Sequence, residues 1–415
     1  MNSPKGEGGE EERSYDVHGA VAMRLVGHDP VSEIIDRTLS FFRSPTKTPD
    51  LTLVLGQYPS QEWTPTGTLV GDRILYDPES RTTSVLRNKA TKKVVRSEAE
   101  YVVIGDLRAW GEPVTVYVPS LRRPMTPRKT FGRDVRHGHL RRAMLAVAGN
   151  PLGMRQVVRQ AEMITEAILE PFLFYRLPAK GLSLIHAASV CSQSAATVFA
   201  GSANIGKSTL ALRFAKEKAA FLGDALVILA ESGEVLPYPG LVKLHGGHLA
   251  SFPELRIRLT AGMGPIGTYL LRSELSANPM EALESLPQRE MVELFDEVII
   301  PKRCKLKEVV LIRRGPFAEA KVEEIDPELL ARVLSAEIYW EAEAAPWRNG
   351  QFIYAPSAAT GRDFFQEAAE HHAKVDEIMR RGVANAKCFM VALPIEAPVQ
   401  MVEGLVPGFR GSTQD

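Results

Sequence analysis

Short apolar runs separated by turn residues dominate the chain between residues 51 and 120. They predict strands at Leu51–Leu55, Arg73–Tyr76, Thr83–Leu86, Tyr101–Ile104 and Val114–Val118. Turn residues between such short strands favour a small antiparallel sheet, with continuation into the next domain left open. The pattern therefore predicts a mostly β domain in the N-terminal part of the chain.

Helical spacing of apolar residues replaces this pattern elsewhere. Asp29 and Pro30 are typical of an N-cap and a first-turn proline, so they predict the start of a short helix. Apolar residues spaced at i, i+4, i+7 and i+11 over 157–168 predict a second helix. Residues 327–340 and 363–380 predict two more, so helices and strands are mixed in the second half.

The length of 415 residues gives an expectation of two or three domains. A polar segment rich in Gly and Glu opens the chain and predicts a disordered tail over 1–15. We expect an N-terminal α+β domain at 16–150 and a nucleotide-binding domain at 151–325. A helical and β extension packed on that core is expected at 326–415.

Charge and cysteine usage narrow the class of protein. The charges of the 50 basic and 50 acidic residues cancel, which argues against a protein that coats nucleic acid or an anionic membrane through its net charge. No apolar run approaches the roughly 20 residues that span a bilayer. Cys191, Cys304 and Cys388 are odd in number and widely spaced, which favours structural thiols over disulfides or a zinc site. A cytoplasmic location is the resulting expectation.

One segment carries the strongest chemical signal, a G-x-x-x-x-G-K-[ST] phosphate-binding loop. Its glycines let successive N–H groups converge on phosphate oxygens, the lysine can reach the β and γ phosphates, and the serine hydroxyl can bind magnesium. The predicted nucleotide-binding residues are Gly201, Ser202, Ala203, Asn204, Ile205, Gly206, Lys207, Ser208 and Thr209.

The flanks of this loop have the required pattern. Residues 195–200 are apolar and predict a buried strand, and 208–219 have helical spacing with cations near the far end. A strand, a glycine loop and a helix in this order place the positive end of the helix dipole against the phosphates. The alternative is a glycine turn that opens an ordinary helix, which the context disfavours.

Two residues near the loop are candidates for catalysis. Residues 221–229 are predicted to form a single buried strand, and Asp224 lies near its start. There it can hold magnesium or accept a proton from a hydroxyl. By itself it would be read as a turn residue at a strand edge. His186 lies in an apolar strand one hairpin before the loop, where a hydrogen-bonded core histidine is the usual alternative.

The ordered set of motifs resembles a known family. Leu184–Ala188, the loop with Thr209, Leu222–Asp224 and Pro237–Pro239 are similar to the catalytic domain of HPr-kinase-like proteins, kinases that phosphorylate serine hydroxyls. The resemblance spans roughly residues 165–315. It implies an α/β phosphate-loop core related to that of phosphoenolpyruvate carboxykinase. It also implies that this chain uses ATP and Mg2+.

The same resemblance implies functional assignments for individual residues. It places His186 and Lys207 in the active site and gives magnesium to Ser208 and Asp224. This family usually has a pair of aspartates where the chain has Asp224 followed by Ala225. A single carboxylate must bind the metal, act as base, or combine both tasks.

Three functions follow from these observations. The first is an ATP-dependent kinase that phosphorylates a hydroxyl of a protein, a peptide or a small molecule. The second is a nucleotide-binding regulatory protein that has weakened or lost transfer activity, which Ala225 suggests. The third, a motor or transporter ATPase, is disfavoured because no Leu-Ser-Gly-Gly motif is present. Assembly into a homo-oligomer is left open.

Weaker features receive structural interpretations. The motif G-x-G-x-x-G at 262–267 contains Pro265, which removes a needed N–H, so we interpret it as a loop. The basic cluster at 122–142 is interpreted as a solvated loop, with steering of an anionic substrate or nucleic acid as the alternative.

Two histidine pairs are also considered. His245 and His248 lie beyond a Tyr-Pro-Gly turn, and a role in a substrate loop is one option for them. His371 and His372 are neighbours on a predicted helix and are expected to point apart into solvent.

Overall fold

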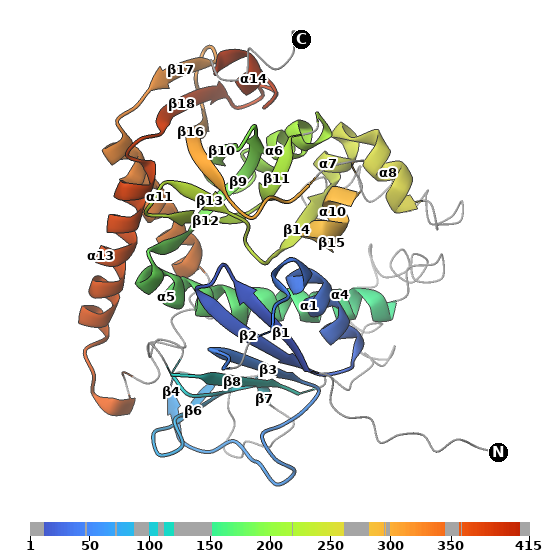
Figure 1. Cartoon of the computed structure of the whole chain (residues 1–415), viewed down its shortest axis with the longest axis vertical. Helices are drawn as coiled ribbons and strands as arrows, with labels where there is room; N and C mark the ends of the chain where they lie inside the picture. Colours follow the sequence, from blue (N-terminus) through green and yellow to red (C-terminus); the bar gives the residue numbers. More distant parts are fainter. Residues whose placement is uncertain are drawn as a thin grey trace, which may run out of the picture. The chain divides into compact units, whose positions relative to one another are not determined.

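The computed structural model of the 415-residue chain divides into two compact units. One comprises Met1–Arg123 with Trp347–Phe364, and the other Pro124–Pro346 with Phe365–Asp415 (Figure 1). The basic segment at 122–142 and the motif at 262–267 lie outside the described residues. The structure describes residues 12–45, 48–70, 73–86, 99–106, 112–119, 152–217, 219–260, 282–293, 295, 299–344, 357 and 359–406.

Within its described residues, the first unit is built on an eight-stranded sheet of order β1-β2-β3-β8-β7-β6-β5-β4. The five strands predicted between residues 51 and 120 are confirmed as β3, β5, β6, β7 and β8. The strands are β1 (Glu12–Val17), β2 (Val21–Val26), β3 (Leu51–Leu55), β4 (Thr68–Val70), β5 (Ile74–Asp77), β6 (Thr82–Leu86), β7 (Ala99–Ile104) and β8 (Val114–Val118).

The expectation of a small antiparallel sheet was only partly correct, because the sheet has eight strands and is mixed. β3 is parallel to both of its neighbours, β2 and β8. A parallel pair needs a crossover connection, and helix α1 (Pro30–Leu39) supplies it between β2 and β3. The sheet also does not continue into the sheet of the second unit. The first strand, β1, begins at Glu12, so residues 12–15 are strand and not part of a disordered tail.

Helix α1 begins as the sequence predicts. Asp29 is its N-cap, with Oδ1 accepting a hydrogen bond of 2.8 Å from the N–H of Ser32, and Pro30 is the first helical residue. The cap satisfies one of the N–H groups that the first turn leaves without a partner. Ile34, Ile35 and Leu39 are buried and fix the helix in the unit.

A second sheet organises the other unit. Its strands are β9 (Leu182–Ser192), β10 (Ala195–Ala200), β11 (Ala220–Gly223), β12 (Leu226–Ala230), β13 (Glu234–Leu236), β16 (Cys304–Gly315), β17 (Lys321–Glu324) and β18 (Lys387–Pro394). β16 pairs with both β10 and β13, so the strands β10-β9-β12-β13-β16 form a closed ring of paired strands. β14 (Leu241–His245) and β15 (Ala282–Pro287) pair separately.

Helices of the second unit complete its core. The rings of Phe199 on β10 and Phe214 on α6 stack with centroids 5.8 Å apart, which anchors α6 to the sheet beside the phosphate loop. The helices are α4 (Leu152–Ile164), a π-helical turn (Thr165–Leu169), α5 (Glu170–Arg176), α6 (Lys207–Lys216), α7 (Gly246–Ser251), α8 (Pro253–Thr260), α10 (Gln288–Glu293), α11 (Pro327–Ala344), α13 (Phe364–Val383) and α14 (Met401–Leu405). Those predicted around 157–168, 327–340 and 363–380 are confirmed.

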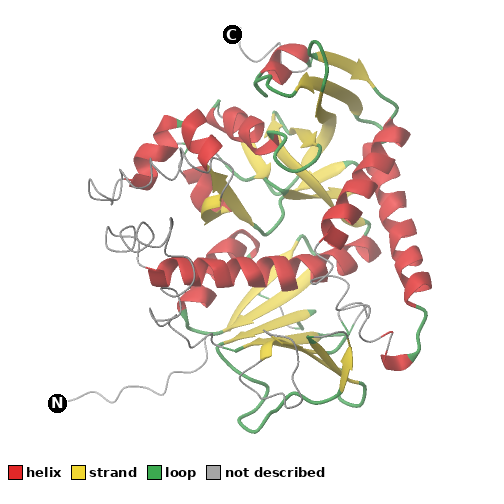
Figure 2. Cartoon of the chain, turned by 180° about the vertical axis from the view of Figure 1, so that it is seen from behind, coloured by secondary structure: helices red, strands yellow, loops and turns green. Residues whose placement is uncertain are grey.

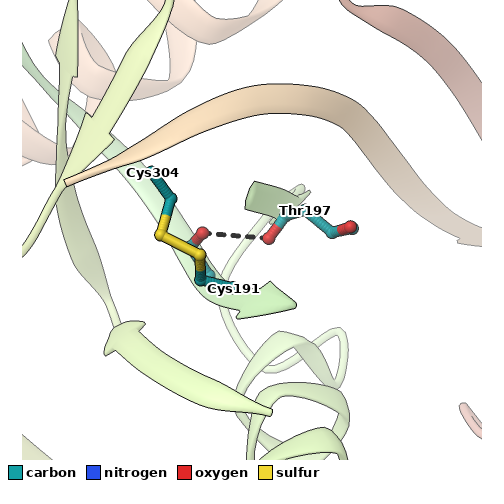
Figure 3. Close-up of a disulfide and its surroundings, with 4 residues drawn as sticks. Cys191, Thr197 and Cys304 are labelled. Carbon is teal, nitrogen blue, oxygen red and sulfur yellow. Dashed lines mark hydrogen bonds between the residues drawn. A yellow bond between two sulfur atoms is a disulfide. The ribbon is translucent and has the colours of Figure 1, made fainter. Parts of the chain in front are cut away.

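Two of the cysteines form a disulfide, contrary to the expectation of three structural thiols. Cys191 near the end of β9 is bonded to Cys304 at the start of β16, with a Cα–Cα distance of 6.3 Å. Figure 3 shows this bond beside Thr197 of β10. The sequence spacing concealed the pair because folding brings together residues separated by 113 positions. Cys388 is free and buried. The cysteines therefore give no support for a reducing compartment.

The histidines of α13 are packed and not solvated as expected. His371 Nε2 lies 2.9 Å from the carbonyl of Phe174, and the His372 ring stacks on Tyr339 with centroids 3.9 Å apart. Burial lowers the pKa of His371 to about 4. Figure 2 shows α11 and α13 side by side, which brings Tyr339 to these histidines. The spacing of residues in the sequence did not indicate that α11 packs against the histidines of α13.

None of the described helices combines the length and the apolar character needed to cross a bilayer.

Candidate functional site

The loop between β10 and α6 has the backbone form that the motif requires. β10 ends at Ala200 and α6 begins at Lys207, so the predicted order of strand, loop and helix is confirmed. Gly201, Asn204 and Gly206 have φ values of 133°, 63° and 109°. A Cβ on Gly201 would lie 2.5 Å from the carbonyl oxygen of Ile312, so only glycine fits there. Alternation of right- and left-handed residues is the geometry that makes successive N–H groups converge.

Lys207 lies across this loop. Its Nζ donates hydrogen bonds to the carbonyl oxygens of Gly201, at 2.6 Å, and Ser202, at 3.0 Å, and the side chain is 5% exposed. The ammonium group is thus held at the loop by neutral carbonyls. An anion in the loop would offer this group a stronger partner.

Ser208 and Asp224 are in direct contact. Ser208 Oγ donates to Asp224 Oδ1 at 2.6 Å, which joins the first turn of α6 to the turn between β11 and β12. A hydroxyl and a carboxylate are the hard oxygen ligands that magnesium prefers. These two residues were predicted to bind magnesium together, and their contact is consistent with that prediction.

The strand predicted over 221–229 is interrupted at this point. β11 ends at Gly223 and β12 begins at Leu226, and Ala225 between them has φ of 63°. The carbonyl of Ala225 accepts from the N–H of Ala187 at 3.1 Å, which fixes the turn to β9. Asp224 therefore lies in a tight turn and not at the start of a continuous strand.

His186 lies on β9 next to this turn. Its register partner on β12 is Leu226, and the neighbouring Ala187 pairs with Ala200, the last residue before the loop. Burial, with a smaller contribution from the positive charge of Lys207, lowers the pKa of His186 to about 3. The imidazole is consequently neutral near pH 7.

The segment after β14 is within electrostatic range of the same carboxylate. The N–H of His245 donates to His248 Nδ1 at 3.2 Å, so neutral His248 has its proton on Nε2. Burial lowers the pKa of His248, and the negative charge of Asp224 partly opposes this effect. The option that His245 and His248 belong to a substrate loop stays a prediction.

Two polar residues of this region, Gln288 and Arg314, were not predicted from the sequence. Gln288 is buried and its Nε2 donates to the carbonyl of Leu222 at 2.7 Å, which supports the strand that leads into Asp224. Arg314 contacts the carbonyl of Ile205 inside the loop, at 3.3 Å. The one signal in the sequence was a pair of arginines before a glycine at the end of an apolar run.

The remaining predicted loop residues have distinct surroundings. Ser202, Ala203 and Asn204 are exposed, whereas Ile205 is buried in the core with α6. Ile205 can therefore serve a ligand only through its backbone. Thr209 lies in the first turn of α6 and is partly buried.

In the described part of the chain, no three His, Cys, Asp or Glu side chains cluster to hold a metal ion by themselves. Magnesium commonly takes one or two protein oxygens and completes its shell with phosphates and water. The Ser208 and Asp224 pair fits this smaller donor set.

Comparison with known proteins adds little to this geometry. No protein-family model matches the chain. The search of curated proteins also found no match. Among solved structures, the HPr(Ser) kinase/phosphatase from Coxiella burnetii aligns with 55% of this chain and 96% of its own, at 11% identity and a TM-score of 0.27. Similarity at this level is weak and carries no argument, so the functional assignment depends on the site itself.

Proposed function

We propose that this chain is a phosphotransferase that moves the γ-phosphate of ATP, bound with magnesium, to a hydroxyl group. The favoured acceptor is a serine of a protein or peptide, and a small molecule is the other candidate. The hydrogen bond of 2.6 Å between Ser208 and Asp224 carries the proposal. A chance occurrence of the loop motif would not require a carboxylate at that hydroxyl. The ordered motifs that resemble HPr-kinase-like proteins support the same choice.

The donor side of the reaction belongs to the loop. Backbone N–H groups of residues 202–207 would bind the polyphosphate, and the ammonium group of Lys207 would stabilise charge that develops on the transferred group. Ser208 and Asp224 would hold magnesium, which neutralises phosphate charge when bound. Each role uses a group that already lies at the loop.

The acceptor side belongs to Asp224 and His186. Asp224 is the group that would take the proton of the acceptor hydroxyl. His186 has a pKa of about 3 and is a weak base at neutral pH, so its role would be to orient the acceptor through a hydrogen bond. This divides between the two residues the tasks of orienting and deprotonating the acceptor, which the sequence left open.

Replacement of Lys207 tests the proposal. Lys207→Ala should reduce phosphoryl transfer roughly a hundredfold or more, because the loop loses its positive charge. The measurement uses γ-labelled ATP with a cell extract resolved by mass, which also identifies the acceptor. Lys216→Ala is the matched control, since Lys216 lies at the other end of α6 and pairs with Glu254. Full transfer by Lys207→Ala would overturn the assignment of the loop.

A second candidate is a nucleotide-binding regulatory protein with weakened or absent transfer. Ala225 favours it, because this exposed position in the turn carries no second carboxylate. ATP binding without any labelled product across the extract would support this function. Steady ATP hydrolysis in the absence of an acceptor would instead support a motor or transporter ATPase.

A further inference from the structure

Arg314 joins the phosphate loop to a segment far away in the sequence. It lies near the end of β16, and its guanidinium group donates to four backbone carbonyl oxygens. Nε bonds Ile205 at 3.3 Å. Nη1 bonds Pro394, Ile395 and Ala397 at 3.4, 2.8 and 2.6 Å. We call residues 394–399 the clasp segment.

The contact with Ile205 affects the direction of the next N–H. In a trans peptide the C=O and N–H bonds point in opposite directions. Since the Ile205 carbonyl points to Arg314, the N–H of Gly206 points away from it. Gly206 is the loop residue just before Lys207, and its N–H is one of those expected to face phosphate.

The clasp segment also touches Gly206 directly. A Cβ on this glycine would lie 2.7 Å from Val399 Cγ2, so the side chain of Val399 closely covers it. Gly206 is thus fixed by the carbonyl contact before it and by a valine against its Cα. Both contacts, from Arg314 and from Val399, come from residues outside the loop.

The clasp segment is itself held firmly against α6. Val399 at its end is buried in the same apolar cluster as Leu210 and Phe214 of α6, as are Val402 and Val406 of the chain that follows it. Glu403 of α14, which follows the clasp segment, adds an ion pair of 2.5 Å with Arg213. A segment anchored in this way can transmit a fixed position to the loop through Arg314.

The partners of Arg314 explain why an arginine is present. The four acceptors described above are carbonyl oxygens, and the planar guanidinium group can donate to several of them in one fixed geometry. A lysine ammonium group is a single point donor and would not reproduce the set. The arrangement is suited to holding backbone in place.

We propose that Arg314 is a positioning residue, which with the clasp segment holds the phosphate loop in its anion-binding form before the nucleotide arrives. Binding then avoids the cost of ordering the loop. This inference rests on the proposed function of the loop and goes beyond it by assigning the segment after β18 to the nucleotide site.

The test compares Arg314→Met with Arg313→Met by titration calorimetry. Arg313 is the matched control because it precedes Arg314 on β16 and its side chain is exposed. Two probes are used, Mg·ATP and inorganic tripolyphosphate with magnesium. Arg314→Met should weaken both by the same factor, about tenfold or more, since only phosphate binding depends on the loop. Arg313→Met should bind both as the wild type does, and thermal unfolding should show that both variants are folded at the temperature of the titration.

The outcomes separate this inference from the proposed function. If the wild type binds neither probe, the proposed function fails. If the wild type binds and Arg314→Met binds equally well, the positioning role is wrong. If Arg314→Met does not fold, Arg314→Lys and Val399→Ala take its place. Weaker binding of both probes by these two folded variants supports the role, and unchanged binding overturns it.

Discussion

Ala225 adopts a left-handed backbone conformation at a position where the resembling family usually has a second aspartate. Aspartate tolerates this conformation better than alanine, because its short polar side chain can hydrogen-bond locally. Ala225→Asp is therefore compatible with the turn and places a second carboxylate beside Asp224.

This substitution decides between the two functions proposed for the site. If transfer is limited by the single carboxylate, Ala225→Asp should raise the rate of phosphoryl transfer from labelled ATP about tenfold or more. Ala225→Asn is the control, because it has the same backbone preference and no charge. An equal rate in both variants would show that the second carboxylate is not what limits transfer.

His186 makes the stability of the protein depend on pH. Its pKa is about 3 in the folded protein and 6.5 in the unfolded chain, so the unfolded chain binds more protons below pH 6.5. The stabilisation is complete above pH 6.5 and is lost as the pH falls toward 3, by up to roughly 1.4 kcal/mol per pH unit.

Urea unfolding at pH 7 and pH 5 checks this dependence in the wild type and in His186→Gln. The variant should lose less free energy of unfolding between the two pH values, because glutamine does not titrate. His371, with a pKa of about 4, contributes in the same direction in both proteins and cancels in the comparison. Equal losses would mean that His186 titrates normally.

At the scale of elements, the disulfide joins β9 and β16, which are not neighbours in the chain. Cross-linking residues 113 positions apart restricts the unfolded chain over a long loop, which is worth about 3 to 5 kcal/mol in the entropic account. Cys191→Ser with Cys304→Ser should lower the free energy of unfolding by this amount.

Urea unfolding of the oxidised wild type and of the double variant measures the difference. Peptide mapping without reductant should recover the Cys191 and Cys304 peptides as one species, with Cys388 free. Cys388→Ser serves as the control that removes a thiol without removing the bond. Recovery of three free thiols from protein prepared without reductant would contradict the pairing.

Elements with strong local patterns were predictable from the sequence. The cap at Asp29, the strand and helix around the loop, and the strands from β5 to β8 follow from neighbouring residues. The parallel neighbours of β3, the insertion of β18 between β16 and β17, and the bond from Cys191 depend on pairings between distant residues. Local periodicity carries no information about such partners.

The candidate site also contains residues that were predictable from the sequence and residues that were not. Lys207 and Ser208 belong to a continuous motif, Asp224 was predicted from its apolar run close to the loop, and the family resemblance pointed to His186. Arg314 acts on backbone carbonyls, which every residue possesses, so its partners had no signature in the sequence. The turn at Ala225 was missed because the apolar run around it continues on both sides.

At the scale of the whole molecule, the loop and all of its named contacts belong to the second unit. Ligand that binds only the folded form should stabilise that unit, by about 2.7 kcal/mol at a hundredfold excess over Kd. With Mg·ATP we expect slower amide hydrogen exchange in residues 201–216, 222–226 and 394–399.

Hydrogen exchange followed by mass spectrometry checks this pattern, with magnesium and adenosine as the control that lacks phosphates. Protection that appears with adenosine alone would indicate binding through the base and not through the loop. Protection with Mg·ATP in none of these segments would contradict a nucleotide site at the loop.

The position of β18 has a consequence for how the protein is made. β18 lies between β16 and β17, and the clasp segment follows it, yet both come long after the phosphate loop in the chain (Figure 1). During translation, which proceeds from the N-terminus, the loop leaves the ribosome without its support. A nascent chain that has not reached residue 399 should therefore bind nucleotide more weakly than the folded chain, so the site is complete only after β18 and the clasp segment have been made.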